Sequence, residues 1–382
     1  MWLKAKATLI SLLAFLCCVG VKSSLHVSPT TPNDPSSNRT ISPELFDELE
    51  ELARIVDISY CVGNSGIYEP FTCVSRCEEF PSFELVKTWN TGPLLADSCG
   101  YIALSHPPSP PRIIVAFRGT YSISNAIVDL STIPQEFEPY PPPSSRLPLK
   151  DDPDASSSCS NCTAHVGFLT SWARTRTEIL PYLEELVKFY PSYDLTLAGH
   201  SLGGAVALFA ALDFHNRGWK PQVTTFGEPR VGNAALIQYI DAMFAETSEE
   251  LWTYRRVTHV RDPVPLLPLS EWSYRMHGNE LFINKAALPP SRTDIVYCDG
   301  DADDSCIAGG DQLVTEKLRG TTEGEARSKW WSEDGGMWAI PARYQLWELL
   351  FAHRDYFHRL GLCVPGGDPG GQWRWNDASK EL

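Results

Sequence analysis

The chain has 382 residues, of which 43% are hydrophobic and 21% are charged. This composition is typical of a globular protein with a full core, and it excludes a chain that is disordered throughout. The 32 basic and 47 acidic residues give a formal net charge of −15. Because no basic cluster occurs in so acidic a chain, we expect no nucleic-acid partner.

The N-terminal residues have the pattern of a secretory signal peptide. Lys4 and Lys6 precede an apolar stretch from Ala7 to Val21, and small residues follow it. This stretch is short for a membrane span, which needs about 18 or more apolar residues, and no other stretch in the chain approaches that length. We therefore predict a signal peptide over residues 1–24, a secreted, extracellular protein, and no transmembrane anchor after signal removal.

The segment after the signal peptide is predicted to be a flexible arm or propeptide. Residues 25–41 are rich in Ser, Pro, Thr and Asn, a composition that buries little apolar surface. Ser42 and Pro43 then provide an N-cap and a first-turn proline for a helix. The apolar face of that helix begins with Leu45 and Leu49.

Strands and helices alternate along the middle of the chain. The predicted strands are Ile113–Phe117, whose continuous apolar run is typical of a buried parallel strand, and Asp194–Ala198, Val223–Phe226 and Trp252–Val260. The predicted helices are Phe168–Tyr190, with an interruption near Pro181, and Leu202–His215. This alternation indicates an α/β fold with a central, mostly parallel sheet and helices on both faces. No internal repeat is visible.

Three segments depart from the alternating pattern. Residues 138–163 form a surface insertion rich in Pro, Ser and Asp, and residues 307–345 form a second one that is rich in Gly, charged residues and Trp. The second insertion has no assigned role. After Cys363 the chain turns polar, and we expect residues 364–382 to be a loose tail.

The strongest chemical signal is the sequence Gly199-His-Ser-Leu-Gly203. It lies between a predicted strand and a predicted helix, which is the context of a nucleophile elbow. So tight a turn requires residues without bulk on both sides of Ser201 and places its hydroxyl above the edge of the sheet. The N-terminus of the following helix favours developing negative charge. The motif therefore predicts that Ser201 is the nucleophile of a serine hydrolase.

A serine hydroxyl needs an adjacent base that is oriented by an acid, and in this arrangement both follow the serine in the chain. Two acids follow predicted strands, Glu228 and Asp262, and the Asp-Pro-Val-Pro turn favours Asp262. Three histidines come later. His277 lies in a strand-like segment, which favours a structural role. Periodicity alone does not separate His353 from His358.

The cysteines and acidic runs give no metal signal. Close cysteine pairs in a secreted chain indicate disulfides, and the CxxC pair Cys159 and Cys162 has no second pair with the spacing of a zinc site. The run from Asp299 to Asp304 lacks the glycine and glutamate of an EF-hand, so we predict a solvated loop. Two sequons predict glycosylation at Asn38 and Asn161.

Eight sequence blocks make the chain resemble the secreted class 3 lipases of filamentous fungi, the Rhizomucor-type triacylglycerol lipases. They occur in the order of that family between about Leu45 and Cys363. The blocks are Val86–Asn90, Phe117–Thr120, His165–Phe168, Tyr190–Tyr193, Gly199–Gly204, Pro229–Gly232, Arg261–Pro265 and His353–Phe357. The resemblance implies an α/β-hydrolase fold with a short helical lid, formed by one domain over residues 42–363.

The resemblance also assigns the catalytic residues. The nucleophile of the family falls on Ser201 and its acid on Asp262. Its histidine is followed by two residues and then by Tyr-Phe, which matches His353 and not His358. The oxyanion donors fall on the backbone N–H of Leu202 and on a residue of the Phe117–Thr120 block. The resemblance implies that this residue is Thr120, through its N–H and its hydroxyl.

The residues after Thr120 resemble the lid of the family. One apolar face of a short helix would be formed by Ile123, Ala126, Ile127 and Leu130. Relatives can carry a tryptophan at a lid position where this chain has Ala126. We therefore expect the lid of this chain to bind a lipid surface less strongly.

By position, the resemblance also implies four disulfides: Cys61–Cys363, Cys73–Cys77, Cys159–Cys162 and Cys298–Cys306. Cys99 has no partner in these pairs and is expected to be a buried thiol.

These observations predict a secreted serine carboxylester hydrolase. It would cleave acylglycerols, including triacylglycerols, at a lipid–water interface through an acyl-enzyme on Ser201, as a monomer and without a cofactor or metal. Feruloyl esterase, phospholipase and galactolipase activities on the same fold remain alternatives, although a soluble phenolic ester needs no apolar lid. A binding protein without activity would require a broken triad, and all triad members are present. No recognisable motif encodes the preferred length of the acyl chain or the position of the ester that is cleaved.

Overall fold

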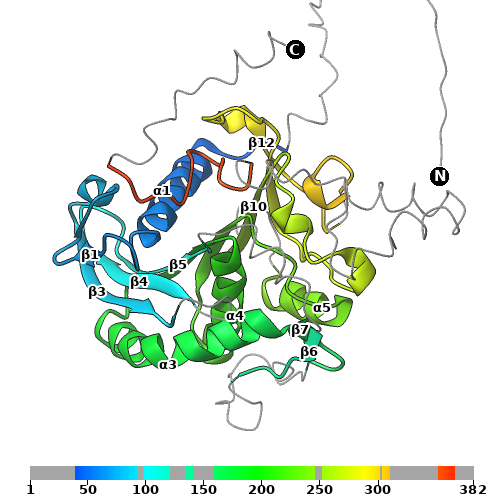
Figure 1. Ribbon diagram of the computed structural model, residues 1–382, viewed down its shortest axis with the longest axis horizontal. Helices are drawn as coiled ribbons and strands as arrows, with labels where there is room; N and C mark the ends of the chain where they lie inside the picture. The colour runs from blue at the N-terminus through cyan, green and yellow to red at the C-terminus, as the bar shows by residue number, and fades with distance from the viewer. Residues whose placement is uncertain are drawn as a thin grey trace, which may run out of the picture. The chain divides into compact units, whose positions relative to one another are not determined.

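The computed structural model describes residues 39–92, 98–120, 134–140, 159–245, 252–301, 303–309 and 352–365 (Figure 1). The chain divides into two units, Met1–Asn38 and Arg39–Leu382, and every described residue belongs to the second. The predicted signal peptide, the lid residues and most of both insertions lie outside the described residues. No helix among the described segments is long and apolar enough to cross a membrane.

An eight-stranded sheet forms the centre of the described part of the chain (Figure 1). Its strand order is β12-β11-β10-β9-β8-β5-β4-β3. The strands are β3 (Phe83–Asn90), β4 (Cys99–Ser105), β5 (Arg112–Arg118), β8 (Asp194–His200), β9 (Gln222–Phe226), β10 (Tyr254–His259), β11 (Glu280–Ile283) and β12 (Ile295–Tyr297). The five strands from β5 to β11 pair in parallel, and the outer pairs are antiparallel. The predicted mostly parallel sheet is confirmed.

The parallel strands are buried on both faces, as their continuous apolar runs predict. Along β5, Ile113 and Val115 belong to the core on the side of α3 (Val166–Phe189) and α4 (Leu202–Asn216). The intervening residues Ile114 and Ala116 belong to the core on the side of α1 (Pro43–Ser59). Side chains alternate across a strand, so one apolar run supplies both cores.

The first helix begins at its predicted capping residue. The hydroxyl of Ser42 accepts a hydrogen bond from the backbone N–H of Leu45 at 3.1 Å, which caps α1. Asn233 caps α5 (Ala234–Met243) in the same way through Leu236. The predicted interruption near Pro181 is wrong, because α3 continues through that residue. Pro181 is exposed, and the turns on either side of it are anchored in the core, so the helix tolerates the missing N–H.

Short elements complete the fold. Two small antiparallel sheets pair β1 (Ile67–Tyr68) with β2 (Thr72–Cys73) and β6 (Pro134–Glu136) with β7 (Thr163–His165). Single turns of 3₁₀ helix are η2 (Cys77–Glu79), η5 (Val264–Leu266), η6 (Ser270–Trp272) and η7 (Arg292–Asp294).

The last residues of the predicted arm pack onto the sheet edge. Thr40 forms an antiparallel bridge with Val296 of β12, and Ile41 is fully buried. The side chain of Arg39 donates to the carbonyl oxygen of Tyr297 at 2.8 Å and pairs with Asp303. Residues 39–41 therefore belong to the body rather than to a flexible arm. Polar composition conceals this pairing, because it is made largely by the backbone.

The structure joins the four cysteine pairs that the resemblance implies. Cys61 and Cys363 are 302 residues apart, and the three other bridges close short loops, Cys73–Cys77, Cys159–Cys162 and Cys298–Cys306. Cys99 is a buried thiol.

Candidate active site

Ser201 lies at the sharp turn between β8 and α4. Its φ of 57° and ψ of −130° form a conformation that residues with a side chain rarely adopt. A Cβ on Gly199 would lie 2.4 Å from the carbonyl oxygen of Gly203, and a Cβ on Gly203 would lie 2.5 Å from that of Phe117. The turn therefore requires glycine on both sides of Ser201, which is the geometry of a nucleophile elbow.

His353 and Asp262 form a buried pair. Nδ1 of His353 lies 2.9 Å from Oδ2 and 3.0 Å from Oδ1 of Asp262, and both side chains have 0% exposure. The hydroxyl of Tyr356 donates to Oδ2 at 2.5 Å, and the backbone N–H of Val264 donates to Oδ1 at 2.9 Å. The carboxylate therefore accepts from three groups.

The charge of Asp262 follows from these contacts. Burial alone would raise the pKa of Asp262, but the proximity of His353 and the hydrogen bonds from Tyr356 and Val264 hold it below its ordinary value. A charged carboxylate retains the proton on Nδ1 of His353. The base position is then Nε2, which has no hydrogen-bond partner among the described residues.

Gly227 links the acid–base pair to the nucleophile turn. Its φ is +61°, and a Cβ at this position would lie 2.8 Å from Cε1 of His353 and 3.0 Å from Oδ2 of Asp262. The preceding residue, Phe226, accepts a hydrogen bond from the backbone N–H of Ser201 at 2.9 Å. The three predicted triad residues therefore come together around residues 226–227.

His200, which the sequence analysis did not assign, supports the backbone of His353. Nε2 of His200 lies 2.8 Å from the carbonyl oxygen of His353, and Nδ1 lies 2.5 Å from the hydroxyl of Tyr60. A carbonyl oxygen only accepts, so Nε2 donates and Nδ1 accepts from Tyr60. Burial, and then the nearby His353, lower the pKa of His200 well below its ordinary value, so the ring stays neutral. Its place inside the Gly-His-Ser motif was the available signal.

The predicted oxyanion residues flank the nucleophile. Leu202 is the first residue of α4, and Thr120 lies two residues beyond the end of β5. Between Thr120 and that strand, a Cβ on Gly119 would lie 2.8 Å from Cβ of Ser201. The chain that leads to Thr120 therefore passes directly beside the nucleophile. The predicted lid residues Ile123, Ala126, Ile127 and Leu130 lie outside the described residues.

The rival acid Glu228 is held elsewhere. Its carboxylate accepts from the hydroxyls of Thr225 at 2.6 Å and Tyr254 at 2.7 Å, and it lies 3.2 Å from Nε2 of His277. His277 lies in the loop before β11 rather than in the predicted strand-like segment. Its pairing with Glu228 agrees with the structural role expected for it.

The rival base His358 has a different environment from that of His353. Burial, and then the positive charges of Arg76 and Arg54, lower the pKa of His358 to about 3. Asp262 pairs with His353 instead. A histidine with so low a pKa is poorly matched to proton transfer near neutral pH.

The predicted glycosylation and loop sites fall into different parts of the chain. Asn161 is exposed, whereas Asn38 lies outside the described residues.

Asp303, expected in a solvated loop, accepts from the backbone N–H groups of Asp299 and Ser305. No group of three or more candidate metal ligands occurs in the segments that the structure describes.

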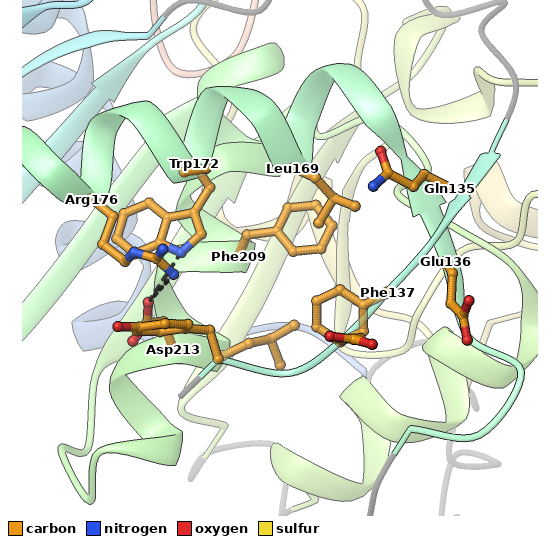
Figure 2. Close-up of a pocket in the computed structure, with 12 residues that line it drawn as sticks. Gln135, Glu136, Phe137, Leu169, Trp172, Arg176, Phe209 and Asp213 are labelled. Atoms are coloured by element: carbon orange, nitrogen blue, oxygen red, sulfur yellow. Dashed lines mark hydrogen bonds and ion pairs between the residues drawn. The ribbon is translucent and has the colours of Figure 1, made fainter. Parts of the chain in front are cut away.

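A separate cavity of about 400 Å³ lies between α3, α4 and residues 135–140 (Figure 2). Phe137, Leu169 and Phe209 line its centre, and at one end Asp213 accepts from the indole N–H of Trp172 at 3.2 Å. Phe209 is eight residues beyond Ser201 on α4, or about 12 Å along the helix axis. None of the triad residues lines this cavity, so it is not the catalytic pocket.

Comparisons with known proteins agree with the motifs. The family model for lipase (class 3) matches residues 114–272. The chain is 51% identical over 374 residues to secreted mono- and diacylglycerol lipase 2 of Gibberella zeae, a match that covers 92% of this chain and 89% of that protein. It is 48% identical over 391 residues to lipase A of Sodiomyces alcalophilus, covering 95% and 93%.

A solved structure gives the same result for the fold. The Lip2 lipase from Yarrowia lipolytica superposes with a TM-score of 0.66 at 27% identity, covering 85% of this chain and 97% of that one. The central sheet, the elbow between β8 and α4 and this similarity confirm the α/β-hydrolase fold.

Proposed function

The chain belongs to the class 3 lipase family, and we propose that it is a secreted enzyme that hydrolyses acylglycerol esters at lipid–water interfaces. The observation that carries the proposal is the buried pair of His353 and Asp262, which lies against Gly227 beside the Ser201 turn. An acid-oriented histidine next to a serine on a strained turn is the machinery of acyl transfer.

The proposed reaction begins with the hydroxyl of Ser201. Its oxygen attacks the ester carbonyl carbon while Nε2 of His353 takes the proton, and Asp262 stabilises the imidazolium that forms. The backbone N–H groups of Leu202 and Thr120 bind the oxyanion of the tetrahedral intermediate. The alcohol leaves with the proton from His353. Water then attacks the acyl-enzyme by the same route and releases the fatty acid.

The substrate class rests on the relatives and on the predicted lid. The relative from Gibberella zeae is named a mono- and diacylglycerol lipase, which favours partial acylglycerols as a second candidate beside triacylglycerols. We propose that residues 122–130 contact the lipid surface. Phospholipase, galactolipase and feruloyl esterase activities remain the alternatives.

Secretion is supported by two independent features. Relatives at 51% and 34% identity are named as secreted lipases. Disulfides persist in oxidising compartments, and the described residues contain four. We propose a signal peptide over residues 1–24, a catalytic domain over residues 42–363 and a monomeric enzyme that is glycosylated at Asn38 and Asn161.

A substrate panel tests the proposed function. Purified protein would be assayed on emulsified triolein, diolein and monoolein, on phosphatidylcholine and galactolipid, and on methyl ferulate, with Ser201→Ala as the matched control. Fatty-acid release from acylglycerols that is absent in Ser201→Ala supports the proposal. Ferulate hydrolysis without acylglycerol hydrolysis would overturn it.

A further inference from the structure

Glu228 is a buried carboxylate that the proposed triad does not use. Its exposure is 2%, and three donors converge on it. Oε2 accepts from Thr225 and Tyr254, and Oε1 lies 3.2 Å from Nε2 of His277. Burial, and then the charge of Glu228, raise the pKa of Tyr254 well above its ordinary value, so that hydroxyl keeps its proton and donates. Both oxygens of the Glu228 side chain therefore have hydrogen-bond partners inside the protein.

His277 is fixed in turn by β10. Arg256 donates to the backbone oxygen of His277 from Nε at 3.1 Å and from a terminal guanidinium nitrogen at 2.8 Å. The ring of Tyr254 meets the ring of His277 edge-on, with centroids 4.8 Å apart. The pair of Glu228 and His277 therefore joins the end of β9, the strand β10 and the loop before β11.

This pair is adjacent in the chain to the point where the triad residues meet. Glu228 directly follows Gly227, which lies against both His353 and Asp262. Phe226, one residue earlier, accepts from the backbone N–H of Ser201. A displacement of residues 226–228 would therefore move the nucleophile relative to the base. The carboxylate of Glu228 is a side-chain anchor that holds this segment to the neighbouring strand.

We propose that Glu228 and His277 are positioning residues for the Ser201–His353–Asp262 triad, an inference that rests on the proposed function. A buried polar pair is often no more stabilising than apolar residues of similar volume. Small displacements of reacting groups, in contrast, reduce rates strongly. The pair therefore acts mainly on the rate of acyl transfer and not on substrate binding.

The central test is Glu228→Gln, which keeps the size of the side chain. Its amide nitrogen only donates, so it would face either the hydroxyls of Thr225 and Tyr254, which would have to turn away, or Nε2 of His277, which would have to change tautomer to accept. We expect kcat on a soluble p-nitrophenyl ester to fall about 10- to 100-fold while KM changes by no more than about twofold. The matched control is Glu48→Gln, which loses a partly exposed ion pair with Arg255. Arg255 lies on β10, next to Tyr254, and this variant should keep the wild-type kcat.

Active-site titration with a phosphonate separates positioning from folding. A purely structural role would lower the number of titrated sites and Tm but leave kcat per titrated site unchanged. Positioning lowers kcat per site in Glu228→Gln at temperatures well below Tm. His277→Gln, whose amide can donate to Glu228, should retain more activity than His277→Leu. The double variant Glu228→Gln/His277→Leu should be no slower than the slower single variant.

The outcomes keep this inference apart from the proposed function. An unchanged kcat per titrated site in Glu228→Gln would overturn the positioning role, even if Tm falls. A wild-type protein that the phosphonate does not titrate would instead overturn the proposed function.

Discussion

Asp262 shows how individual contacts define the candidate site. Four hydrogen-bond contacts reach its two oxygens, two of them from His353. If this pair is the catalytic one, His353→Ala should abolish ester hydrolysis as Ser201→Ala does, by several orders of magnitude, whereas His358→Ala should retain it. Initial rates on tributyrin, with circular dichroism to check folding, would measure this. Activity in His353→Ala combined with loss in His358→Ala would reverse the assignment.

Tyr356 gives a second prediction at the residue scale. Its hydroxyl donates to the charged form of Asp262, so Tyr356→Phe should lower the free energy of unfolding at pH 7 by about 2 kcal/mol. The pKa of Asp262 is held below its ordinary value, so the stabilisation is complete above the unfolded pKa of about 4 and is lost as the pH falls through the lower folded value. Urea unfolding of both proteins at pH 7 and at pH 3 would check this, and an equal difference at both pH values would contradict it.

The sequence predicted these site residues unequally. Ser201 and its glycines could be predicted because the elbow constrains consecutive residues. Asp262 followed from its place after a strand and from the Asp-Pro-Val-Pro turn, and His353 required a family motif, since its contact spans 91 residues. The contacts of Tyr356, His200 and Glu228 span 49 to 153 residues, so the local sequence gives only their positions, such as that of His200 inside the Gly-His-Ser motif, and not their partners.

At the scale of elements, periodicity and capping predicted α1, α3, α4 and four of the five parallel strands, but they missed α5, β11 and the pairing of Thr40 with β12. Edge pairing uses backbone groups that any residue supplies. Pro181 was misleading for a related reason, because tertiary anchoring on both sides outweighs one missing hydrogen bond.

The contacts of Arg39 at the β12 edge of the sheet give a further prediction. Its guanidinium contacts Asp303, Ser305 and the backbone of Tyr297. Arg39→Ala should lower the free energy of unfolding by about 1 kcal/mol, a small value because the side chain is about one-third exposed and its ion pair is screened. Chemical denaturation in low and high salt would measure the loss. A larger loss in high salt than in low salt would contradict this account.

At the scale of the whole molecule, the bridge between Cys61 and Cys363 ties the segment that carries His353 to the end of α1. Tyr60, next to Cys61, contacts His200, and the backbone N–H of Gly361 donates to Asp57 of α1 at 2.8 Å. Neither contact can be predicted from local sequence, because their partners are more than 100 residues apart. The bridge therefore closes the fold around the candidate base.

Removal of this bridge should cost more than removal of a short one. In the chain-entropy model, a closed loop of 302 residues stabilises the folded state by about 6 kcal/mol, and a loop of 3 residues by about 2 kcal/mol. Cys61→Ser/Cys363→Ser should therefore lower the unfolding midpoint more than Cys159→Ser/Cys162→Ser does. The first pair should also lower kcat at temperatures where the protein stays folded, because the segment with His353 loses its anchor. Equal midpoint shifts for the two double variants, measured by thermal denaturation, would count against this role for the long-range bridge.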